Sequence, residues 1–247
     1  MPQGPLPWLN PVIAHRGASG SAPENTLAAI RRAADLGAHW VEVDVRQTAT
    51  GELVLLHDAT LDRTTNGRGK VAETSYETVA ALDAGAWFAP EFAGERVPTL
   101  AAFVALCTER GLFANVEIKA EAEREEAVAE AVVTLLQDLW PNAKPPPLIS
   151  ASQPRILRKA ALVVPDFPRG LIVRDVPNEV VLAERASGCV SVHPNADLLT
   201  KAKTEFLLAG GYAVLAYTVN DPERARVLRG WGVNAIFTDY PEPERWR

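Results

Sequence analysis

The sequence predicts an α/β protein with a single domain over residues 1–247, a TIM (β/α)8 barrel with a small inserted subdomain after the second strand. Apolar segments typical of buried strands alternate with segments of helical periodicity, which favours a parallel sheet covered by helices. The length of 247 residues suits one closed barrel of about 250 residues. An open doubly wound sheet is the alternative, but the first strand lacks the glycine-rich phosphate fingerprint of such folds. Eight strands are expected, starting near residues 12, 40, 113, 148, 170, 189, 212 and 233.

The first strand, Val12-Ile13-Ala14, is short and apolar and leads into His15-Arg16-Gly17. A helix is predicted over residues 27–36, because its apolar residues recur at helical spacing. Asn25 or Thr26 is expected to cap the amino terminus of this helix, and a glycine follows its last residue.

The second strand is expected over residues 40–45, where valines alternate strictly with carboxylates. Glu42 and Asp44 therefore share one face of the strand, with their Cβ atoms about 7 Å apart. Two acids this close in an apolar strand repel each other unless a cation lies between them. A hard divalent ion bound through oxygen is the simplest such cation. The alternative is an antiparallel strand with one solvent-exposed face.

An insertion is predicted after the second strand. Residues 52–57 are expected to form an extra strand beside the second one, and residues 58–97 interrupt the alternation with turn-rich and aromatic sequence. We expect this insertion to pack over the carboxyl-terminal face of the barrel, with one or two helical turns over 76–82. Loops of this length within a compact domain are usually functional.

From residue 100 onward the alternation of helices and strands resumes. The acidic run 121–126 is assigned to the first turns of a helix, where the helix dipole favours negative charge, and not to a metal site. Helices are predicted over 100–109, 121–139, 154–163, 178–186, 197–209 and 221–231, and strands over 112–119, 148–150, 170–174, 189–193, 212–219 and 233–238.

Composition limits the partners and the location of the protein. Hydrophobic residues make up 47% of the chain and charged residues 23%, as in a globular protein with a sizeable core. The net charge of −6 argues against nucleic acid and against stable association with an anionic membrane. Cys107 and Cys189 lack metal-ligand spacing and are predicted to be buried thiols of a reducing compartment. The chain shows no secretory signal and no apolar run of about 18 residues, so a cytoplasmic location is predicted.

Polar side chains gather where the predicted strands end, which in a barrel of this kind is where the active site lies. Glu42, Asp44 and Glu117 are predicted to bind one divalent cation from adjacent strands, and their oxygen ligands favour Mg²⁺ or Ca²⁺ over Zn²⁺. The full set of strand-end residues is His15, Arg16, Glu42, Asp44, His57, Asp58, Glu117, Lys119, Thr218, Asn220, Thr238 and Asp239.

The cationic and imidazole side chains of this set suit a phosphate ester. Arg16 and Lys119 supply positive charge for a phosphate group, the first as a planar fork and the second as a point charge. Because imidazole changes its charge near neutral pH, His15 and His57 are predicted to act as general acid and base.

The other two histidines, His39 and His193, stand apart from these carboxylates and cations and are predicted to be structural. Tyr217, Trp87 and Phe88 are candidates for lining a substrate pocket, with ordinary core packing as the alternative.

These residues belong to a longer series of short motifs, and the order and spacing of the series are specific where each motif alone is weak. From Val12 to Pro241 the series resembles the glycerophosphodiester phosphodiesterase family. In chain order it reads His15-Arg16-Gly17, Pro23-Glu24-Asn25-Thr26, Glu42-Val43-Asp44-Val45, His57-Asp58, Arg63-Thr64-Thr65, Gly67, Gly69, Val97-Pro98-Thr99-Leu100, Glu117-Ile118-Lys119, Thr218-Val219-Asn220 and Thr238-Asp239.

The resemblance implies a TIM barrel with an insertion after the second strand. It implies hydrolysis of glycerophosphodiesters, such as glycerophosphocholine or glycerophosphoethanolamine, to sn-glycerol 3-phosphate and an alcohol. Carried over by position, the metal ligands are Glu42, Asp44 and Glu117, the acid–base pair is His15 and His57, and the phosphate contacts are Arg16 and Lys119.

Two positions depart from the family pattern. Tyr217 stands where the family often has tryptophan, and Ala151 stands where it often has phenylalanine, which leaves the preferred alcohol open.

Two other functions are alternatives to this hydrolysis. A phospholipase C or D acting on lipid head groups would be expected to carry a secretion signal, disulfides or an exposed apolar surface. A non-catalytic glycerophosphodiester-binding protein would be expected to lack a histidine or a carboxylate of the set.

Overall fold

A closed barrel of eight parallel strands forms the centre of the protein. The computed structural model describes residues 6–186 and 188–246. Neighbouring barrel strands pair in parallel, and β1 pairs with both β2 and β9, which closes the sheet. The predicted TIM barrel is confirmed, and the open sheet is excluded. The barrel strands are β1 (Val12–His15), β2 (Trp40–Gln47), β4 (Phe113–Ile118), β5 (Leu148–Ala151), β6 (Arg169–Val173), β7 (Ser191–Pro194), β8 (Ala213–Ala216) and β9 (Ala235–Thr238).

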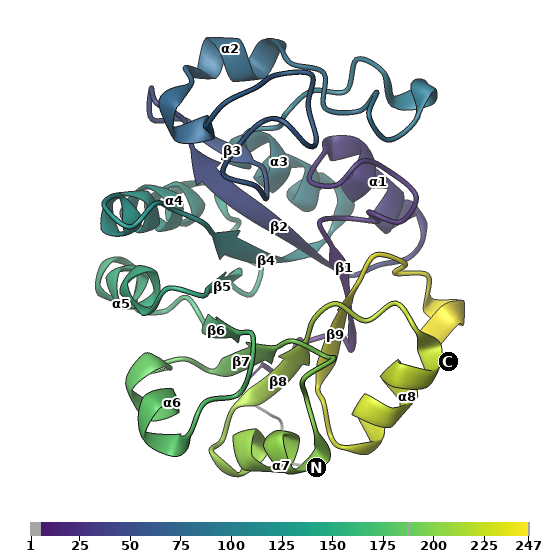
Figure 1. Cartoon of the computed structure of the whole chain (residues 1–247), viewed down its shortest axis with the longest axis vertical. Helices are drawn as coiled ribbons and strands as arrows, with labels where there is room; N and C mark the ends of the chain where they lie inside the picture. Colours follow the sequence, from purple (N-terminus) through teal and green to yellow (C-terminus); the bar gives the residue numbers. More distant parts are fainter. Residues whose placement is uncertain (1–5, 187, 247) are drawn as a thin grey trace.

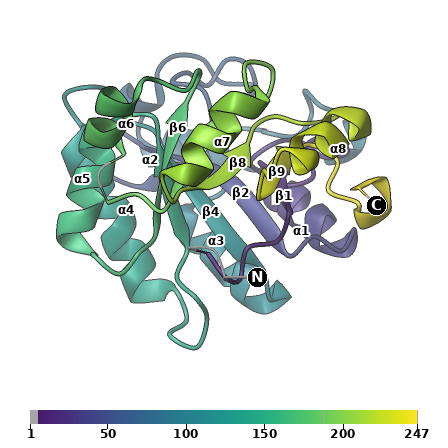
Figure 2. The same ribbon diagram turned by 90° about the horizontal axis from the view of Figure 1, so that it is seen from below.

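Helices connect these strands and surround the barrel (Figure 1). Seen after a 90° turn, α4 and α5 lie on one side of the strands and α8 on the other (Figure 2). The last three strands begin one or two residues later than predicted. The helices are α1 (Leu27–Asp35), α3 (Leu100–Arg110), α4 (Glu125–Leu139), α5 (Pro154–Val163), α6 (Glu179–Arg185), α7 (Lys201–Ala209) and α8 (Pro222–Gly230).

Side-chain caps decide where several helices begin. Thr26 caps α1 by accepting a hydrogen bond from the backbone N–H of Ala29, so the cap is Thr26 and not Asn25. Thr200 caps α7 in the same way, through the N–H of Lys203. The helix therefore starts at Lys201, and the predicted start at residue 197 was wrong.

The acidic run before α4 is only partly helical. Glu125 and Glu126 occupy the first turn of α4, as predicted, but Glu121 lies before the helix. Its carboxylate instead approaches Arg46 Nη1 of β2 at 3.5 Å. The prediction that the whole run lies within the helix was wrong, because Glu121 reaches back toward the neighbouring strand.

The apolar core forms two layers, one inside the barrel and one between the sheet and the helices. The alternation of β2 explains the division, since Val41, Val43 and Val45 pack outward against the helices while Trp40 points inward. Trp40 stacks on Phe113 with ring centroids 5.6 Å apart. The inner layer consists of Leu6, Ile13, Trp40, Leu148, Ala213, Leu215, Ala235 and Phe237.

Replacement of Trp40 by alanine is expected to lower the free energy of unfolding by about 3–5 kcal/mol, because it empties a large part of the inner layer. Trp40 is 1% exposed, whereas Trp87 is 41% exposed and serves as a matched control. Urea denaturation followed by circular dichroism measures both variants. A loss of stability in Trp87→Ala as large as that in Trp40→Ala would contradict this packing.

The segment after β2 contains the predicted extra strand, β3 (Leu53–Leu55), which pairs antiparallel with β2. Short helices follow, η1 (Val71–Glu73), α2 (Tyr76–Ala81) and η2 (Pro90–Phe92). Figure 1 shows this segment beyond β3, to one side of the barrel. That residues 58–97 cover the carboxyl-terminal face stays a prediction. The segment has its own small core of Val54, Leu56, Leu61, Val71, Val79, Ala84 and Val97.

The two cysteines differ in burial. Cys107 is buried in the outer layer, as predicted, but Cys189 is only partly buried, so the prediction of two buried thiols was wrong for Cys189. Within the part of the chain that the structure describes, no helix combines the length and the apolar character needed to cross a bilayer.

Candidate active site

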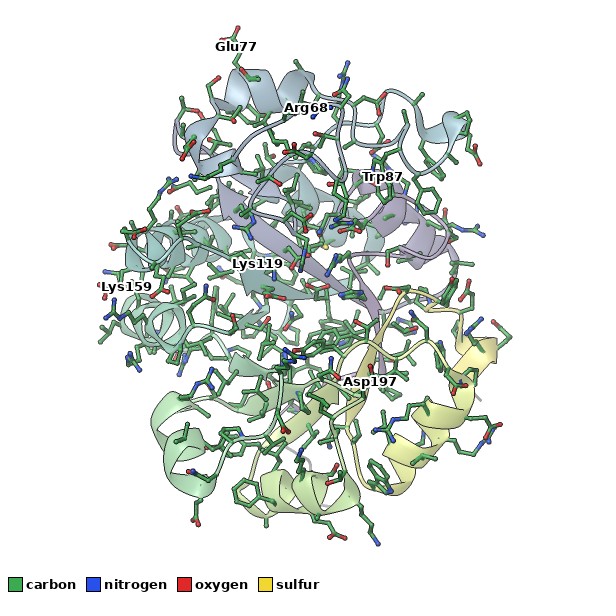
Figure 3. The ribbon with its side chains drawn as sticks, in the orientation of Figure 1. Arg68, Glu77, Trp87, Lys119, Lys159 and Asp197 are labelled. Carbon is green, nitrogen blue, oxygen red and sulfur yellow. The ribbon has the colours of Figure 1, made fainter. Side chains whose placement is uncertain are left out.

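A cavity of about 480 Å³ opens at the carboxyl-terminal ends of the barrel strands. Seven of the eight residues predicted for the site line it, and the eighth, Asp44, is buried beside them. Figure 3 shows two of the lining residues, Lys119 near the centre of the molecule and Asp197 below it. The seven residues are His15, Arg16, Glu42, His57, Glu117, Lys119 and Tyr217.

A second cavity, of about 500 Å³, lies beside α8 and the start of β9. His39 and Arg229 are the ionisable residues among those that line it. Among the described residues, no carboxylate lines this second cavity, so the first cavity is the better candidate for chemistry.

Three carboxylates from two adjacent strands meet at the edge of the first cavity. Glu42 and Asp44 come from β2 and Glu117 from β4, and each offers an oxygen within 4.8 Å of the others. Asp44 and Glu117 are direct partners in the parallel pairing of β2 with β4. The alternation noted in the sequence thus places the acids inside the barrel, and the alternative of an antiparallel strand with a wet face is excluded.

The electrostatics of this trio suit a bound cation. Burial, followed by the charges of Asp44 and Glu117, raises the pKa of Glu42 well above its ordinary value. Burial and the charge of Asp44 also raise the pKa of Glu117, to about 7. Burial would raise the pKa of Asp44 too, but Lys119 and Arg16 outweigh it and lower that pKa. A cation would relieve the repulsion that raises the pKa of Glu42 and of Glu117.

The donor set also fits a hard divalent ion. All three side chains bind through oxygen, which Mg²⁺ and Ca²⁺ prefer. Glu42 is 3% exposed, and its Oε1 has no hydrogen-bond partner among the described residues. A buried carboxylate oxygen without a partner is costly. The residues present therefore fit a divalent cation held by Glu42, Asp44 and Glu117.

Two residues with a left-handed backbone hold these carboxylates in place. Arg16 has φ +57° and donates its backbone N–H to Glu42 Oε2 at 2.9 Å. Asn25 has the same φ, donates Nδ2 to Asp44 Oδ2 at 2.8 Å and accepts the backbone N–H of Asp44 at 3.1 Å. Sequence reasoning assigned Asn25 only to a helix cap, because its contact with Asp44 spans 19 residues of sequence.

The two predicted phosphate-binding cations are tied to the same carboxylates. Arg16 Nε lies 3.2 Å from Asp44 Oδ2, and Lys119 Nζ lies 2.5 Å from Glu117 Oε1 and 3.3 Å from Asp44 Oδ1. Burial alone would lower the pKa of Lys119, but Asp44 and Glu117 outweigh it and raise that pKa. For Arg16 too, burial would lower the pKa, but Asp44, Glu24 and Glu42 outweigh it and raise that pKa. Both side chains therefore stay charged beside the cavity.

Each of the two predicted acid–base histidines is paired with its own carboxylate. His15 Nδ1 lies 2.8 Å from Asp239 Oδ1, and His57 Nδ1 lies 2.7 Å from Asp58 Oδ1. With Nδ1 engaged in this way, Nε2 is the ring nitrogen left for proton transfer, and the carboxylate fixes the orientation of the ring. Burial lowers the pKa of His57, so this imidazole is mostly neutral at pH 7.

Asp58 and Asp239, the carboxylates that pair with the histidines, were recognised as strand-end residues, but no role was predicted for them. Burial would raise the pKa of Asp239, but its hydrogen bond to His15 and the further bonds of Asn220 and Ser19 outweigh it and lower that pKa to about 2. Asn220 Nδ2 donates to Asp239 Oδ2 at 2.6 Å. The pair of His57 and Asp58 could have been predicted, because the two residues are adjacent in the sequence. The pair of His15 and Asp239 could not, because the two residues are 224 positions apart.

An ion-pair network links the insertion to both halves of the site. Arg63 of the insertion donates to Asp58 Oδ2 at 2.7 Å and to Glu24 Oε2 at 2.7 Å. Glu24 in turn accepts from Arg16 Nη1 at 2.7 Å. Arg63 thus touches the partner of His57 and the partner of Arg16.

Replacement of Arg63 by alanine is expected to lower kcat about tenfold, because Asp58 then loses the cation that orients it toward His57. A comparable loss follows when groups that orient a metal-binding histidine are removed. Arg68→Ala is the matched control, since Arg68 is an exposed arginine of the same insertion (Figure 3). Steady-state kinetics of both variants measure the effect, and equal activity of the two variants would contradict the role of the network.

Two other predictions about single residues have different outcomes. Tyr217 lines the cavity, and its hydroxyl donates to Val173 O at 3.2 Å. His39 is exposed and outside this cavity, whereas His193, also predicted to be structural, lines it with 1% exposure. The sequence had indicated that His193 stands apart from the site residues, whereas the structure places it among them.

Comparison with known proteins finds a matching family and similar sequences. A family model described as "Glycerophosphoryl diester phosphodiesterase family" matches residues 15–243. The chain is 35% identical to a glycerophosphodiester phosphodiesterase of Caldanaerobacter subterraneus subsp. tengcongensis, over 94% of each chain. It is 30% identical to a glycerophosphodiester phosphodiesterase of Bacillus subtilis, over 93% of this chain and 83% of that protein.

Solved structures show the same similarity. A phosphodiesterase from Oleispira antarctica, solved in complex with the product sn-glycerol-3-phosphate, superposes with a TM-score of 0.91 at 36% identity, over 95% of each chain. A glycerophosphodiester phosphodiesterase from Agrobacterium tumefaciens superposes with a TM-score of 0.80 at 26% identity, over 96% of this chain and 99% of that one.

The fold, the site and these relatives define an enzyme of the phosphoric diester hydrolase class. Within that class, the chain belongs to the glycerophosphoryl diester phosphodiesterase family.

Proposed function

We propose that the protein hydrolyses glycerophosphodiesters, such as glycerophosphocholine and glycerophosphoethanolamine, to sn-glycerol 3-phosphate and an alcohol. The observation that carries the proposal is one cavity lined by two histidines, each paired with its own carboxylate, together with Arg16 and Lys119. A phosphodiester needs positive charge on its non-bridging oxygens and one proton transfer at each end of the reaction. The cavity contains a group for each of these tasks.

The chemistry divides among the residues according to their charge. Arg16 and Lys119 bind and neutralise the non-bridging phosphate oxygens. One histidine removes a proton from the attacking oxygen and the other donates a proton to the departing alcohol, each through Nε2. A Mg²⁺ or Ca²⁺ ion held by Glu42, Asp44 and Glu117 would supply Lewis-acid stabilisation of the phosphate charge. Tyr217 contributes to the wall of the substrate pocket.

Two attacking groups are compatible with this arrangement. Water attacks the phosphorus directly, or the glycerol hydroxyl beside the ester attacks first and gives a cyclic phosphate that water then opens. In the second route the two histidines exchange roles between the two steps. Phosphorus NMR during turnover detects the cyclic phosphate, and uniform absence of this species together with ¹⁸O from water in the first product would contradict the second route.

A coupled assay for sn-glycerol 3-phosphate tests the proposed activity. The protein is incubated with a panel of glycerophosphodiesters that differ in the alcohol, with Mg²⁺ or Ca²⁺ and with EDTA. We expect release of sn-glycerol 3-phosphate in the presence of the ion. Binding without release would instead indicate a non-catalytic binding protein, and cleavage of intact phospholipids alone would indicate a phospholipase.

A further inference from the structure

We propose that His193 and Asn115 form a hydroxyl-binding subsite at the floor of the cavity, which recognises the glycerol moiety of the substrate. This inference rests on the proposed function, and it assigns a role to two residues that the chemistry of phosphate transfer does not use. Both residues line the cavity that holds the catalytic groups, and each is 1% exposed.

Each of the two side chains keeps one polar atom without a partner. Asn115 Nδ2 donates to Ser150 Oγ at 2.9 Å, while its Oδ1 has no partner among the described residues. His193 Nε2 lies 2.9 Å from Ser191 Oγ, while its Nδ1 likewise lacks a partner within the described ranges. Leaving a buried polar atom unsatisfied costs about 1–3 kcal/mol. Both residues line the same cavity, so these two unpaired atoms indicate a place where a ligand completes their hydrogen bonds.

Both residues of the subsite lie on barrel strands and not on loops. Asn115 lies on β4, where its Cα partner in β2 is Glu42, so it stands directly beside the carboxylate trio. His193 lies on β7, and its ring occupies the space over Gly170 of β6. A Cβ atom at Gly170 would lie 2.4 Å from His193 Nε2 and 2.6 Å from Ser191 Oγ, so only glycine leaves room for this pair.

The chemistry of the floor selects a neutral hydroxyl over a charged head group. Burial lowers the pKa of His193 to about 3, so its ring is neutral at pH 7. A neutral ring whose Nε2 interacts with Ser191 offers at Nδ1 either a donor or an acceptor, depending on the tautomer. A hydroxyl group satisfies both cases, and it also donates to the Asn115 carbonyl oxygen. The glycerol half of the substrate carries such hydroxyls next to the phosphate.

Two phosphate monoesters of similar size separate recognition of the hydroxyls from recognition of the phosphate. sn-Glycerol 3-phosphate and n-propyl phosphate carry the same phosphate group, but only the first has hydroxyls. We expect calorimetry on the full chain, with Mg²⁺ present, to show about tenfold tighter binding of sn-glycerol 3-phosphate, since two hydrogen bonds to neutral groups contribute about that factor. Equal affinity of the two ligands for the wild-type protein would overturn the proposal.

Variants of His193 then test whether this residue causes the difference in affinity between the two ligands. We expect His193→Leu, which is similar in size but cannot hydrogen-bond, to weaken sn-glycerol 3-phosphate about fivefold and n-propyl phosphate less than twofold. We expect His193→Gln to recover part of the loss. His39→Gln, a change at the exposed histidine outside the cavity, should leave both affinities unchanged. Equal weakening of both ligands by folded His193→Leu protein would indicate a structural role and overturn the proposal.

The experiment still tests the proposal if one variant does not fold. Thermal unfolding identifies such a variant, and the wild-type comparison together with His193→Gln then decides. Failure of this proposal is distinct from failure of the proposed function. Hydrolysis of glycerophosphocholine by a wild-type protein that binds both monoesters equally rejects the subsite alone, whereas selective binding without hydrolysis rejects the activity alone.

Discussion

Alanine in place of His57 is expected to lower kcat by about 10²–10⁴, the range that general acid or base catalysis contributes. The ring lines the cavity and is held by Asp58 at 2.7 Å, so its removal deletes one of the two proton transfers. We expect His15→Ala to have an effect of the same size, because its ring is held in the same way by Asp239. Steady-state kinetics with glycerophosphocholine measure both variants.

The control for these variants separates loss of chemistry from loss of structure. His39 is exposed and lies outside the site, so His39→Ala should keep wild-type kcat. Binding of Mg²⁺ or Ca²⁺ should change little in His57→Ala, because its imidazole is not one of the three proposed ligands. Near wild-type turnover by His57→Ala would rule out the proposed acid–base pair.

Removal of the divalent cation is expected to have the second large effect, a loss of turnover to background that Mg²⁺ or Ca²⁺ restores. The reason is electrostatic, since Glu42, Asp44 and Glu117 lie within 4.8 Å of one another and repel an incoming phosphate unless a cation neutralises them. Glu42→Gln should bind the ion at least tenfold more weakly, as measured by calorimetry. Glu77→Gln, on the exposed face of α2, is the matched control (Figure 3). Full activity in EDTA after extensive dialysis would contradict the metal site.

Ion binding should also depend on pH, in a direction that the carboxylates determine. Without the ion, burial and Asp44 raise the pKa of Glu117 to about 7, so at pH 6 this carboxyl group is mostly protonated. A cation binds only the ionised form, so binding should release protons and the apparent affinity should rise between pH 6 and pH 8. Calorimetry in two buffers with different ionisation enthalpies counts the released protons. An affinity independent of pH would contradict the raised pKa.

The barrel was predictable because its signals are local. A parallel strand buried on both faces is short and apolar, and an amphipathic helix repeats its apolar residues at helical spacing, so each element can be read from a few neighbouring residues. The errors lie at element ends. Thr200 caps α7, so this helix starts later than predicted, and Glu121 turns toward Arg46 instead of joining α4. Both outcomes depend on single side-chain contacts that periodicity does not report.

Two features can be read from the residues alone, the eight-stranded barrel and the strand alternation that turns Glu42 and Asp44 to the same side. These features are predictable because the period of a strand and the position of a strand end are properties of neighbouring residues. Three features became visible only in the folded chain, namely that Asn25 holds Asp44, that Asp239 holds His15, and that His193 borders the cavity. The Asn25–Asp44 and His15–Asp239 contacts join residues 19 and 224 positions apart, and the pairing of β1 with β2 and with β9 brings such residues close together.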